Sequence, residues 1–327
     1  MKPRVFVTRR IPEAGLALIR GACDVDLLDG ELPPTRETML SRIRGREGLV
    51  CLLTDTVDAE VIAAAGPNLK VISNYAVGFD NIDVAAAAAA RIPVGNTPGV
   101  LTEATADLAF ALLMAGARRL AEGSRFAREG RWRTWSPQLL LGADVHGATL
   151  GIVGLGRIGR ALARRAAGFS MRVVYFDPLP GVGPADCAAP ATWPELIAQA
   201  DFVSLHVPLT AATRHMIDAA ALAAMKPTAI LINTSRGGAV DHDALADALA
   251  RGAIGGAALD VTEPEPLPPG HRLYSLDNCL IVPHLGSATV STRDKMAVMA
   301  ADNLLAGLRG ERLPHCVNPE VYSEGCK

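Results

Sequence analysis

The chain has 327 residues, half of them hydrophobic and 4% aromatic, and its 32 basic and 34 acidic residues leave a net charge of −2. This length suits two domains, and the lack of a basic excess argues against nucleic acid or a membrane surface as a partner. No apolar run has the length of a signal peptide or the roughly 20 residues of a membrane span. Six cysteines without a CxxC pair are typical of free thiols in a reducing cytoplasm and indicate no metal site.

The first hundred residues alternate between short apolar runs and helical patterns, which predicts a parallel sheet with right-handed crossovers. Strands are expected over Arg4–Thr8, Val25–Leu28, Leu49–Leu53 and Val71–Ser73. Helices are expected after Pro12 and over Thr35–Arg44, Val57–Ala65 and Val84–Ala90, the last capped by Asp83.

The stretch NYAVGFDNID begins at Asn74, where a strand ends and a loop begins. Ligands of open α/β sheets bind at the carboxyl ends of strands. Gly78 would leave the backbone N–H groups of Val77 and Gly78 free to hold a carboxylate. An ordinary turn is the alternative, and this stretch by itself favours the turn.

A long amphipathic helix is expected over Thr102–Leu120, followed by a less regular segment from Gly130 to Gly142. That segment holds Trp132 and Trp135, two of the three tryptophans in the chain. They indicate either core packing or an arm that reaches a partner subunit.

A glycine-rich motif, GIVGLGRIGRALARR, follows the short apolar run that ends at Val153. Gly154 can turn tightly, Gly156 has no Cβ to keep a pyrophosphate away, and Gly159 lets helix and strand approach. The next β-branched run ends on Asp177, where a carboxylate can bind the adenosine ribose. The full order of strand, glycines, helix, strand and acid predicts a dinucleotide site.

Asp177 also bears on the choice of dinucleotide. A 2′-phosphate about 4 Å from this carboxylate would be repelled by roughly 4 kcal/mol at an effective dielectric near 20. No basic residue lies between Pro178 and Thr213 to offset the repulsion. NADH is therefore expected over NADPH, although Arg157 or Arg172 could fold back and soften the preference.

The alternation then continues and completes a second sheet of six strands. These strands are expected over Leu150–Val153, Arg172–Phe176, Phe202–His206, Ala229–Asn233, Ala257–Asp260 and Leu280–Pro283. Helices are expected over Asp218–Ala224, Asp241–Arg251 and Thr289–Leu308. Six strands is the number of a full dinucleotide-binding sheet.

The helices from Thr102 and Thr289 mirror each other in the chain. We therefore expect an α/β protein with two Rossmann-like or flavodoxin-like parallel-sheet domains linked by two helices, with a cleft between them. Residues 1–100 and 288–327 would form the substrate-binding domain, and residues 101–287 the NAD-binding Rossmann domain.

Three successive strand ends of the second sheet carry polar residues suited to chemistry: Arg236, Glu265 and His284. Arginine offers a forked cation for a carboxylate. Histidine is the usual proton donor near neutral pH, and a neighbouring carboxylate favours its charged form. Taken singly, Arg236 could be a solvated loop residue, Glu265 an exposed residue of a proline-rich turn, and His284 a helix cap.

These motifs together resemble the D-isomer-specific 2-hydroxyacid dehydrogenases over essentially the whole chain. The matching stretches are NYAVGFDNID, NTPGVLTEATADLAFALL, GIVGLGRIGRALARR, INTSRGGAVD, ALDVTEPEPLP and VPHLGSAT. Within that family the chain is most similar to glyoxylate/hydroxypyruvate reductases, through VPHLGSAT, DVTEPEP and the WRTW arm.

The resemblance implies that Arg236 binds a 2-oxoacid, His284 donates the proton in its reduction, and Glu265 orients His284. It implies substrate contacts from Leu53, the Val77 and Gly78 amides, Arg236, His284 and Trp135, the last entering the active site of a homodimeric partner. The implied dinucleotide contacts are Thr105, Gly154, Gly156, Arg157, Ile158, Gly159, Asp177, His206, Pro208, Thr213, Thr234, Ser235, Asp260 and Gly286.

Asp177 departs from the family pattern, because several similar reductases prefer NADPH and carry basic residues in this region. The implied reaction is hydride transfer from NADH to a small 2-oxoacid such as glyoxylate or hydroxypyruvate. Reduction of 2-ketogluconate or a bulkier 2-oxoacid remains an alternative, as does a non-enzymatic NAD-sensing protein like the co-repressors that share this fold. Formate dehydrogenase relatives usually have glutamine in place of Glu265, and phosphite oxidation is excluded only weakly.

Overall fold

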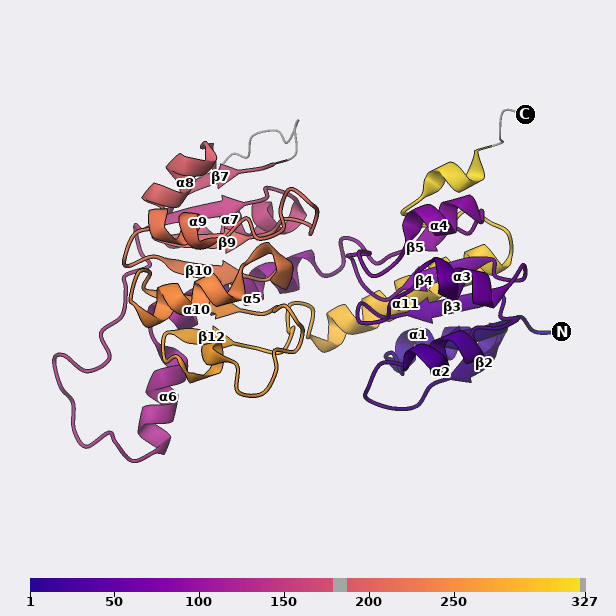
Figure 1. Ribbon diagram of the computed structural model, residues 1–327, viewed down its shortest axis with the longest axis horizontal. Helices are drawn as coiled ribbons and strands as arrows, with labels where there is room; N and C mark the ends of the chain where they lie inside the picture. The colour runs from indigo at the N-terminus through magenta and orange to yellow at the C-terminus, as the bar shows by residue number, and fades with distance from the viewer. Residues whose placement is uncertain (179–186, 324–327) are drawn as a thin grey trace. The chain divides into compact units, whose positions relative to one another are not determined.

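The computed structural model describes residues 1–178 and 187–323 (Figure 1). The chain divides into two compact units. The terminal unit comprises Met1–Leu101 and Thr289–Lys327, and the central unit comprises Thr102–Ala288. These boundaries lie within one residue of those expected from the sequence.

The terminal unit is built on a five-stranded parallel sheet in the order β2-β1-β3-β4-β5. Its strands are β1 (Arg4–Val7), β2 (Asp24–Leu27), β3 (Gly48–Cys51), β4 (Val71–Asn74) and β5 (Val94–Gly95). Its helices are α1 (Glu13–Ala22), α2 (Arg36–Arg42), α3 (Ala59–Ala65), α4 (Val84–Ala89) and α11 (Val290–Leu308), with a short 3₁₀ turn η3 (Pro319–Tyr322).

Helix α11 brings the end of the chain back onto the sheet formed by its beginning. A Cβ on Gly15 of α1 would lie 2.2 Å from the carbonyl oxygen of Ala297, so only glycine lets α1 and α11 approach this closely. The hydroxyl of Ser73 on β4 donates to the carbonyl of Ala300 at 2.8 Å. The two sequence-distant parts of the terminal unit therefore share one core.

Strand β5 was not predicted, because its two residues are too few to show a periodic pattern. Its place at the sheet edge depends on tertiary contacts. Val94 pairs with Ile72 of β4, and the Val94 amide donates to the side chain of Asn318 at 2.8 Å.

The central unit contains a seven-stranded parallel sheet in the order β12-β11-β10-β9-β6-β7-β8. Its strands are β6 (Thr149–Val153), β7 (Arg172–Phe176), β8 (Ala189–Pro190), β9 (Phe202–Leu205), β10 (Ile230–Asn233), β11 (Gly256–Leu259) and β12 (Cys279–Ile281). Its helices are α5 (Thr102–Ala117), α6 (Leu120–Arg128), α7 (Arg157–Ala167), α8 (Trp193–Gln199), α9 (Ala219–Ala224) and α10 (His242–Ala250), with 3₁₀ turns η1 (Gly237–Ala239) and η2 (Arg272–Ser275).

The predicted fold class, two α/β units with parallel sheets, is confirmed. The prediction of six strands for the second sheet was wrong by one. The extra strand is β8, a two-residue edge strand that pairs with β7 and gives no periodic signal. The unpredicted α8 does have a local signal, a capping box formed by Thr192 and Glu195.

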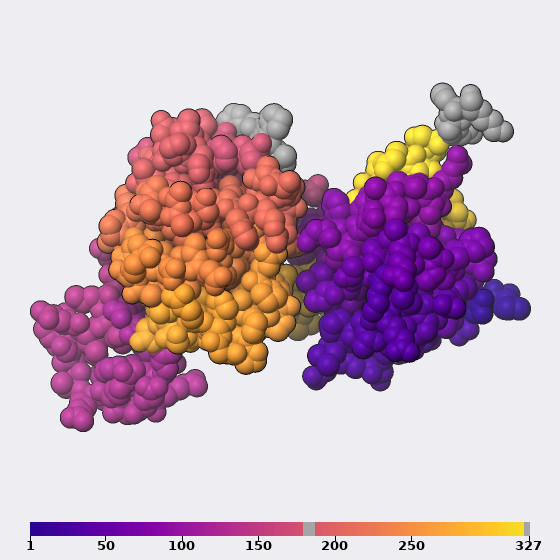
Figure 2. Space-filling view, in the orientation of Figure 1, coloured from indigo at the N-terminus to yellow at the C-terminus, as the bar shows by residue number. Residues whose placement is uncertain are grey.

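The helix predicted over Thr102–Leu120 was also wrong at its end. Helix α5 stops at Ala117, and Arg119 takes a left-handed backbone conformation with φ 51° before α6 begins. The Arg119 side chain pairs with Glu122 on the first turn of α6. None of the α6 residues is buried, and Figures 1 and 2 show α6 and the segment after it standing away from the rest of the central unit.

Within residues 1–178 and 187–323, no helix combines the length and apolar character needed to span a membrane. In the same part of the chain, no cluster of three or more histidine, cysteine or acidic side chains is arranged to hold a metal ion.

Candidate active site

The glycine loop lies between β6 and α7, where the strand order reverses in the interior of the central sheet. Gly154 has φ +93°, and a Cβ there would lie 2.8 Å from the carbonyl carbon of His206. A Cβ on Gly159 would lie 2.3 Å from the Gly154 carbonyl oxygen. The protein's own backbone therefore requires glycine at these two positions.

Gly156 differs from these two glycines, because a Cβ added there would meet no protein atom within 4 Å. Gly156 is the N-cap of α7, and no side chain caps this helix end. Open space beside an uncapped helix N-terminus suits the pyrophosphate of a dinucleotide. The residues present thus fit the cofactor that the sequence pattern predicts.

Asp177 directly follows β7, the strand beside β6. Its Oδ2 accepts a hydrogen bond from the Leu155 amide in the glycine loop at 2.7 Å. The structure therefore holds the Asp177 carboxylate against the loop, at the position where an acid would meet the adenosine ribose.

His206 and Thr234 follow β9 and β10 and contain buried polar atoms without partners in the described part of the chain. His206 Nε2 lies 2.9 Å from the Ser204 hydroxyl, whereas its Nδ1 is unpaired, as is the Thr234 hydroxyl. Burial lowers the pKa of His206 to about 4, so its imidazole is neutral at physiological pH. Buried polar atoms of this kind are rare in folded proteins, and a functional role of the site is one reason for them.

Other expected cofactor residues form two local groups. In the first, the Thr213 hydroxyl donates to the Pro208 carbonyl at 2.6 Å. In the second, the Thr105 hydroxyl donates to the Gly286 carbonyl at 3.2 Å, and the Gly286 amide donates to Asp260 at 2.8 Å.

The three residues expected to do chemistry follow three neighbouring strands, since β12, β11 and β10 are adjacent in the sheet. His284 Nδ1 and Glu265 Oε1 lie 2.6 Å apart, with side chains 27% and 33% exposed. His284 does not cap the following helix, because Thr289 caps α11. The histidine is instead oriented by a carboxylate.

Asp260 holds the segment that carries His284. It is 2% exposed, and its carboxylate accepts from the Leu285 amide at 2.5 Å and the Gly286 amide at 2.8 Å. Burial raises the pKa of Asp260, and these hydrogen bonds oppose that effect. His284 itself has a left-handed φ of 53°, so its backbone conformation is held by the surrounding structure.

Arg236 and Glu265 lie on loops that pack closely together. A Cβ on Gly237 would be 2.0 Å from the backbone of Thr262, so glycine is required for this contact. The Arg236 carbonyl accepts from the Asn233 side chain at 2.8 Å, and the Ser235 amide and hydroxyl bond to the same side chain. Hydrogen bonds to the Asn233 side chain therefore hold the loop at Ser235 and at the Arg236 carbonyl.

The loop after β4 in the terminal unit is more ordered than a simple turn. The carbonyls of three successive residues, Ala76, Val77 and Gly78, each accept a hydrogen bond. The donors are the Thr97 amide at 2.9 Å, the Asn96 side chain at 2.8 Å and the Asn74 side chain at 2.8 Å.

This arrangement fixes the direction of the amides that the sequence singled out. In a trans peptide the N–H points opposite to the preceding carbonyl, so the bonds to Ala76 and Val77 direct the amides of Val77 and Gly78 the other way. Within the described residues, neither amide donates a hydrogen bond to the protein. Two adjacent amides without protein acceptors are suited to hold an anion.

The two remaining expected substrate contacts are not part of these clusters. Leu53 lies just beyond β3 and is 37% exposed. Trp135 lies on the segment after α6 and is 79% exposed.

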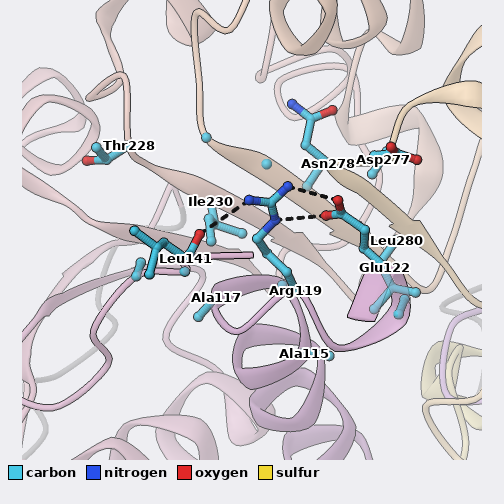
Figure 3. Close-up of a pocket in the computed structure, with 18 of the residues that line it drawn as sticks. Ala115, Ala117, Arg119, Glu122, Leu141, Thr228, Ile230, Asp277, Asn278 and Leu280 are labelled. Carbon is cyan, nitrogen blue, oxygen red and sulfur yellow. Dashed lines mark hydrogen bonds and ion pairs between the residues drawn. The ribbon is translucent and has the colours of Figure 1, made fainter. Parts of the chain in front are cut away.

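A pocket of about 460 Å³ in the central unit lies away from this chemistry. Figure 3 shows its lining, which includes Thr228, Ile230 and Asn278 near the amino ends of β10 and β12. Arg119 lies across it and bonds to Glu122 at 2.7 Å and to the Leu141 carbonyl at 3.3 Å. Since the catalytic candidates follow the carboxyl ends of these strands, this pocket is not the candidate active site.

The residues that sequence reasoning missed are mainly amides. Asn74, Asn81 and Asn96 bond to the loops around Val77 and Gly78 or Leu53. In the sequence, the only indication of these residues is an amide side chain within or just after an apolar run.

A glycine loop at the reversal point of a parallel sheet, with an acid after the next strand, defines the central unit as a dinucleotide-binding domain. Residues 110–286 match the family described as "D-isomer specific 2-hydroxyacid dehydrogenase, NAD binding domain". The chain belongs to the D-isomer specific 2-hydroxyacid dehydrogenase family, as its motifs indicated, and is an NAD(P)-dependent oxidoreductase.

Similar curated proteins cover nearly the whole chain. A protein of Korarchaeum cryptofilum named glyoxylate reductase is 53% identical over 324 residues, which are 98% of this chain and 97% of that protein. A Thermococcus litoralis protein of the same name is 48% identical over 329 residues, 99% of each chain.

Solved structures agree with this assignment. A Thermus thermophilus protein superposes with a TM-score of 0.90 at 50% identity, covering 96% of this chain and 99% of that one. An NADPH-dependent glyoxylate/hydroxypyruvate reductase of Sinorhizobium meliloti, solved with NADP and malonate, gives a TM-score of 0.86 at 32% identity over the full length of both chains.

Proposed function

We propose that the protein reduces glyoxylate or hydroxypyruvate to the corresponding D-2-hydroxyacid, with NADH as the preferred cofactor. The observation that carries the proposal is the 2.6 Å contact between His284 and Glu265, which follow the adjacent strands β12 and β11, while Arg236 follows β10 beside β11. The names of the curated relatives support the choice of substrate.

The glycine loop would hold the pyrophosphate at Gly156, and Asp177 would accept hydrogen bonds from the ribose hydroxyls. His206, Pro208, Thr213, Thr234 and the other expected contacts would surround the remainder of the dinucleotide. The bound cofactor supplies the hydride that reduces C2 of the substrate. The preference for NADH is supported by the negative charge of Asp177, which opposes a 2′-phosphate.

Two side chains, Arg236 and His284, and two backbone amides would act on the substrate. Arg236 would bind the 2-oxoacid and stabilise the negative charge that develops on its carbonyl oxygen. The Val77 and Gly78 amides would hold the carboxylate.

His284 would complete the reduction by transferring a proton. With its Nδ1 bonded to Glu265, the ring presents Nε2 for donation to the forming alkoxide. Glu265 would thus select the tautomer and orientation of the ring, as the carboxylate does in other histidine-carboxylate pairs.

The free thiols support a cytoplasmic location. Cys23, Cys51, Cys187, Cys279 and Cys316, the cysteines in the described residues, form no disulfide. A reducing compartment maintains this state.

Initial rates with the wild-type protein and His284→Gln test the proposal. We expect wild-type turnover of glyoxylate and hydroxypyruvate with NADH faster than with NADPH, and a loss of about 10³-fold or more in kcat for the variant. NADH binding by the variant, measured by fluorescence, should be unchanged.

Each other outcome has a definite meaning. Faster turnover with NADPH would refute the role given to Asp177 and leave the reductase assignment in place. Retained turnover in His284→Gln would refute the proton donor. Tight NADH binding without turnover of any 2-oxoacid would favour a nucleotide-sensing protein.

A further inference from the structure

The side chain of Asn81 connects two separate loops at the carboxyl edge of the terminal sheet. Its Nδ2 donates to the Leu52 and Asp55 carbonyls, each at 3.0 Å. Its Oδ1 accepts from Asn74 Nδ2 at 3.1 Å. One side chain therefore joins the loop after β3 to the loop after β4.

From Asn81 the hydrogen bonds extend into the loop after β4. Asn74, fully buried at the end of β4, also donates to the Gly78 carbonyl at 2.8 Å. Its Oδ1 lies 3.5 Å from the Cys51 thiol at the end of β3. The Gly78 peptide is thus linked to Asn81 through a single buried amide.

The bonds also continue on the side of the β3 loop. The buried Asp55 carboxylate accepts from the Leu52 amide at 2.7 Å and from the Thr8 hydroxyl at 2.5 Å. The exposed Leu53 lies between Leu52 and Asp55, and the Asn81 side chain donates to the carbonyls of both. A continuous set of hydrogen bonds therefore fixes Leu53 relative to Gly78.

The chemistry at position 81 admits few residues. Two carbonyl oxygens facing one side-chain atom require a donor with two N–H groups, which an amide nitrogen supplies. Aspartate would place negative charge against both carbonyls, and alanine or serine would leave at least one without its donor. The Asp55 amide still donates to the Leu52 carbonyl at 3.0 Å, so the turn itself has a second support.

We propose that Asn81 is a positioning residue that sets the spacing between the carboxylate-binding amides and Leu53, and thereby selects the size of the 2-oxoacid side chain. The inference rests on the proposed function, because Val77, Gly78 and Leu53 contact substrate only if that function holds. Asn81 would touch no substrate and would act through the two loops.

The test compares Asn81→Ala with Asn318→Ala. Asn318 is a matched control, because it is 1% exposed, accepts from the Val94 amide at 2.8 Å and donates to the Ile92 carbonyl at 3.0 Å, and its side chain bonds to neither loop. For Asn81→Ala we expect the KM for glyoxylate to rise about tenfold while kcat changes less than about threefold and NADH affinity is unchanged. Asn318→Ala should lower the melting temperature but leave the KM within about twofold.

The selectivity between short and long 2-oxoacids tests the inference more specifically than the KM alone. The ratio of kcat/KM for glyoxylate to that for a longer 2-oxoacid such as 2-oxobutyrate should change about fivefold in Asn81→Ala. That change should disappear in a Leu53→Ala background, because residues acting through one contact are not additive. Asn81→Ser, which keeps one donor, serves if the alanine variant does not fold, and should show the same effects at smaller size.

Three results would overturn the inference. They are an unchanged KM and selectivity in the Asn81 variants, an equal KM rise in Asn318→Ala, or a selectivity change that is additive with Leu53→Ala. A wild-type protein that reduces no 2-oxoacid would overturn the proposed function first, so the two failures are distinguishable.

Discussion

At the scale of single residues, burial decides the protonation of His206. The sequence places this histidine after a strand but does not show how far it is removed from water. Burial lowers its pKa from the ordinary 6.5 to about 4. The native state therefore keeps His206 neutral over a range in which the unfolded chain binds a proton.

The expected consequence is a stability cost in mild acid. As pH falls below 6.5, the unfolded state gains a proton that the native state cannot bind, and the native state loses stability until about pH 4. Between pH 7 and pH 5 this loss is about 2 kcal/mol for His206. Urea unfolding of the wild-type protein and His206→Asn at both pH values measures it.

The comparison with the variant isolates His206 from other groups. Burial lowers the pKa of His242 in the same direction and raises that of Asp260, which has the opposite effect on the pH dependence. Both groups remain in His206→Asn. Equal losses of stability in the two proteins would contradict the assignment.

Among the secondary-structure elements, the β6–α7 loop contains three glycines with different structural roles. Gly154 and Gly159 are required by the fold, since a Cβ on either would collide with backbone. Gly156 faces open space, so the fold by itself does not require glycine there. We propose that the reason for glycine here is a ligand that approaches the backbone.

Replacing Gly156 with alanine tests the ligand's requirement for glycine separately from the fold's requirement for glycine. We expect Gly156→Ala to weaken NADH binding about tenfold or more, close to 1.4 kcal/mol, with the melting temperature almost unchanged. Gly154→Ala is the contrast, because its φ of +93° and its contact with His206 should lower the melting temperature. NADH fluorescence titration and thermal unfolding measure both, and unimpaired binding in Gly156→Ala would argue against a pyrophosphate at this loop.

At the scale of the whole molecule, the segment after α5 carries apolar surface that the single chain leaves exposed. Leu120, Trp132, Trp135 and Leu141 are 57%, 64%, 79% and 64% exposed. Tryptophans of this exposure are typical of surfaces that a partner covers. We propose that a second copy of the chain covers them in a homodimer.

Light scattering after size-exclusion chromatography tests this assembly. We expect a dimer at micromolar concentration, and a monomer with strongly reduced turnover for the double variant Trp132→Ser, Trp135→Ser, because the interface loses its largest apolar side chains. Tyr274→Ser, which removes an aromatic residue 51% exposed elsewhere in the central unit, should remain dimeric. A wild-type monomer would refute the proposal.

Features that depend on neighbouring residues could be predicted from the sequence alone. Strand and helix periods predicted most elements within a residue or two, and the glycine spacing predicted the turn into α7. The positions of Arg236, Glu265 and His284 followed from the rule that parallel strands end at one edge of the sheet. These inferences succeed because backbone preferences and side-chain periods act over a few residues.

Features that join distant residues could not be predicted in this way and are seen only in the folded chain. Asn81 bonds to Leu52 across 29 positions, and Asn318 holds β5 across 224. The break after α5 likewise involves a hydrogen bond from Arg119 to the Leu141 carbonyl, 22 positions away. An amide or a charge in the sequence does not reveal its partner, because its hydrogen bonds are chosen by which segments the fold brings within about 3 Å.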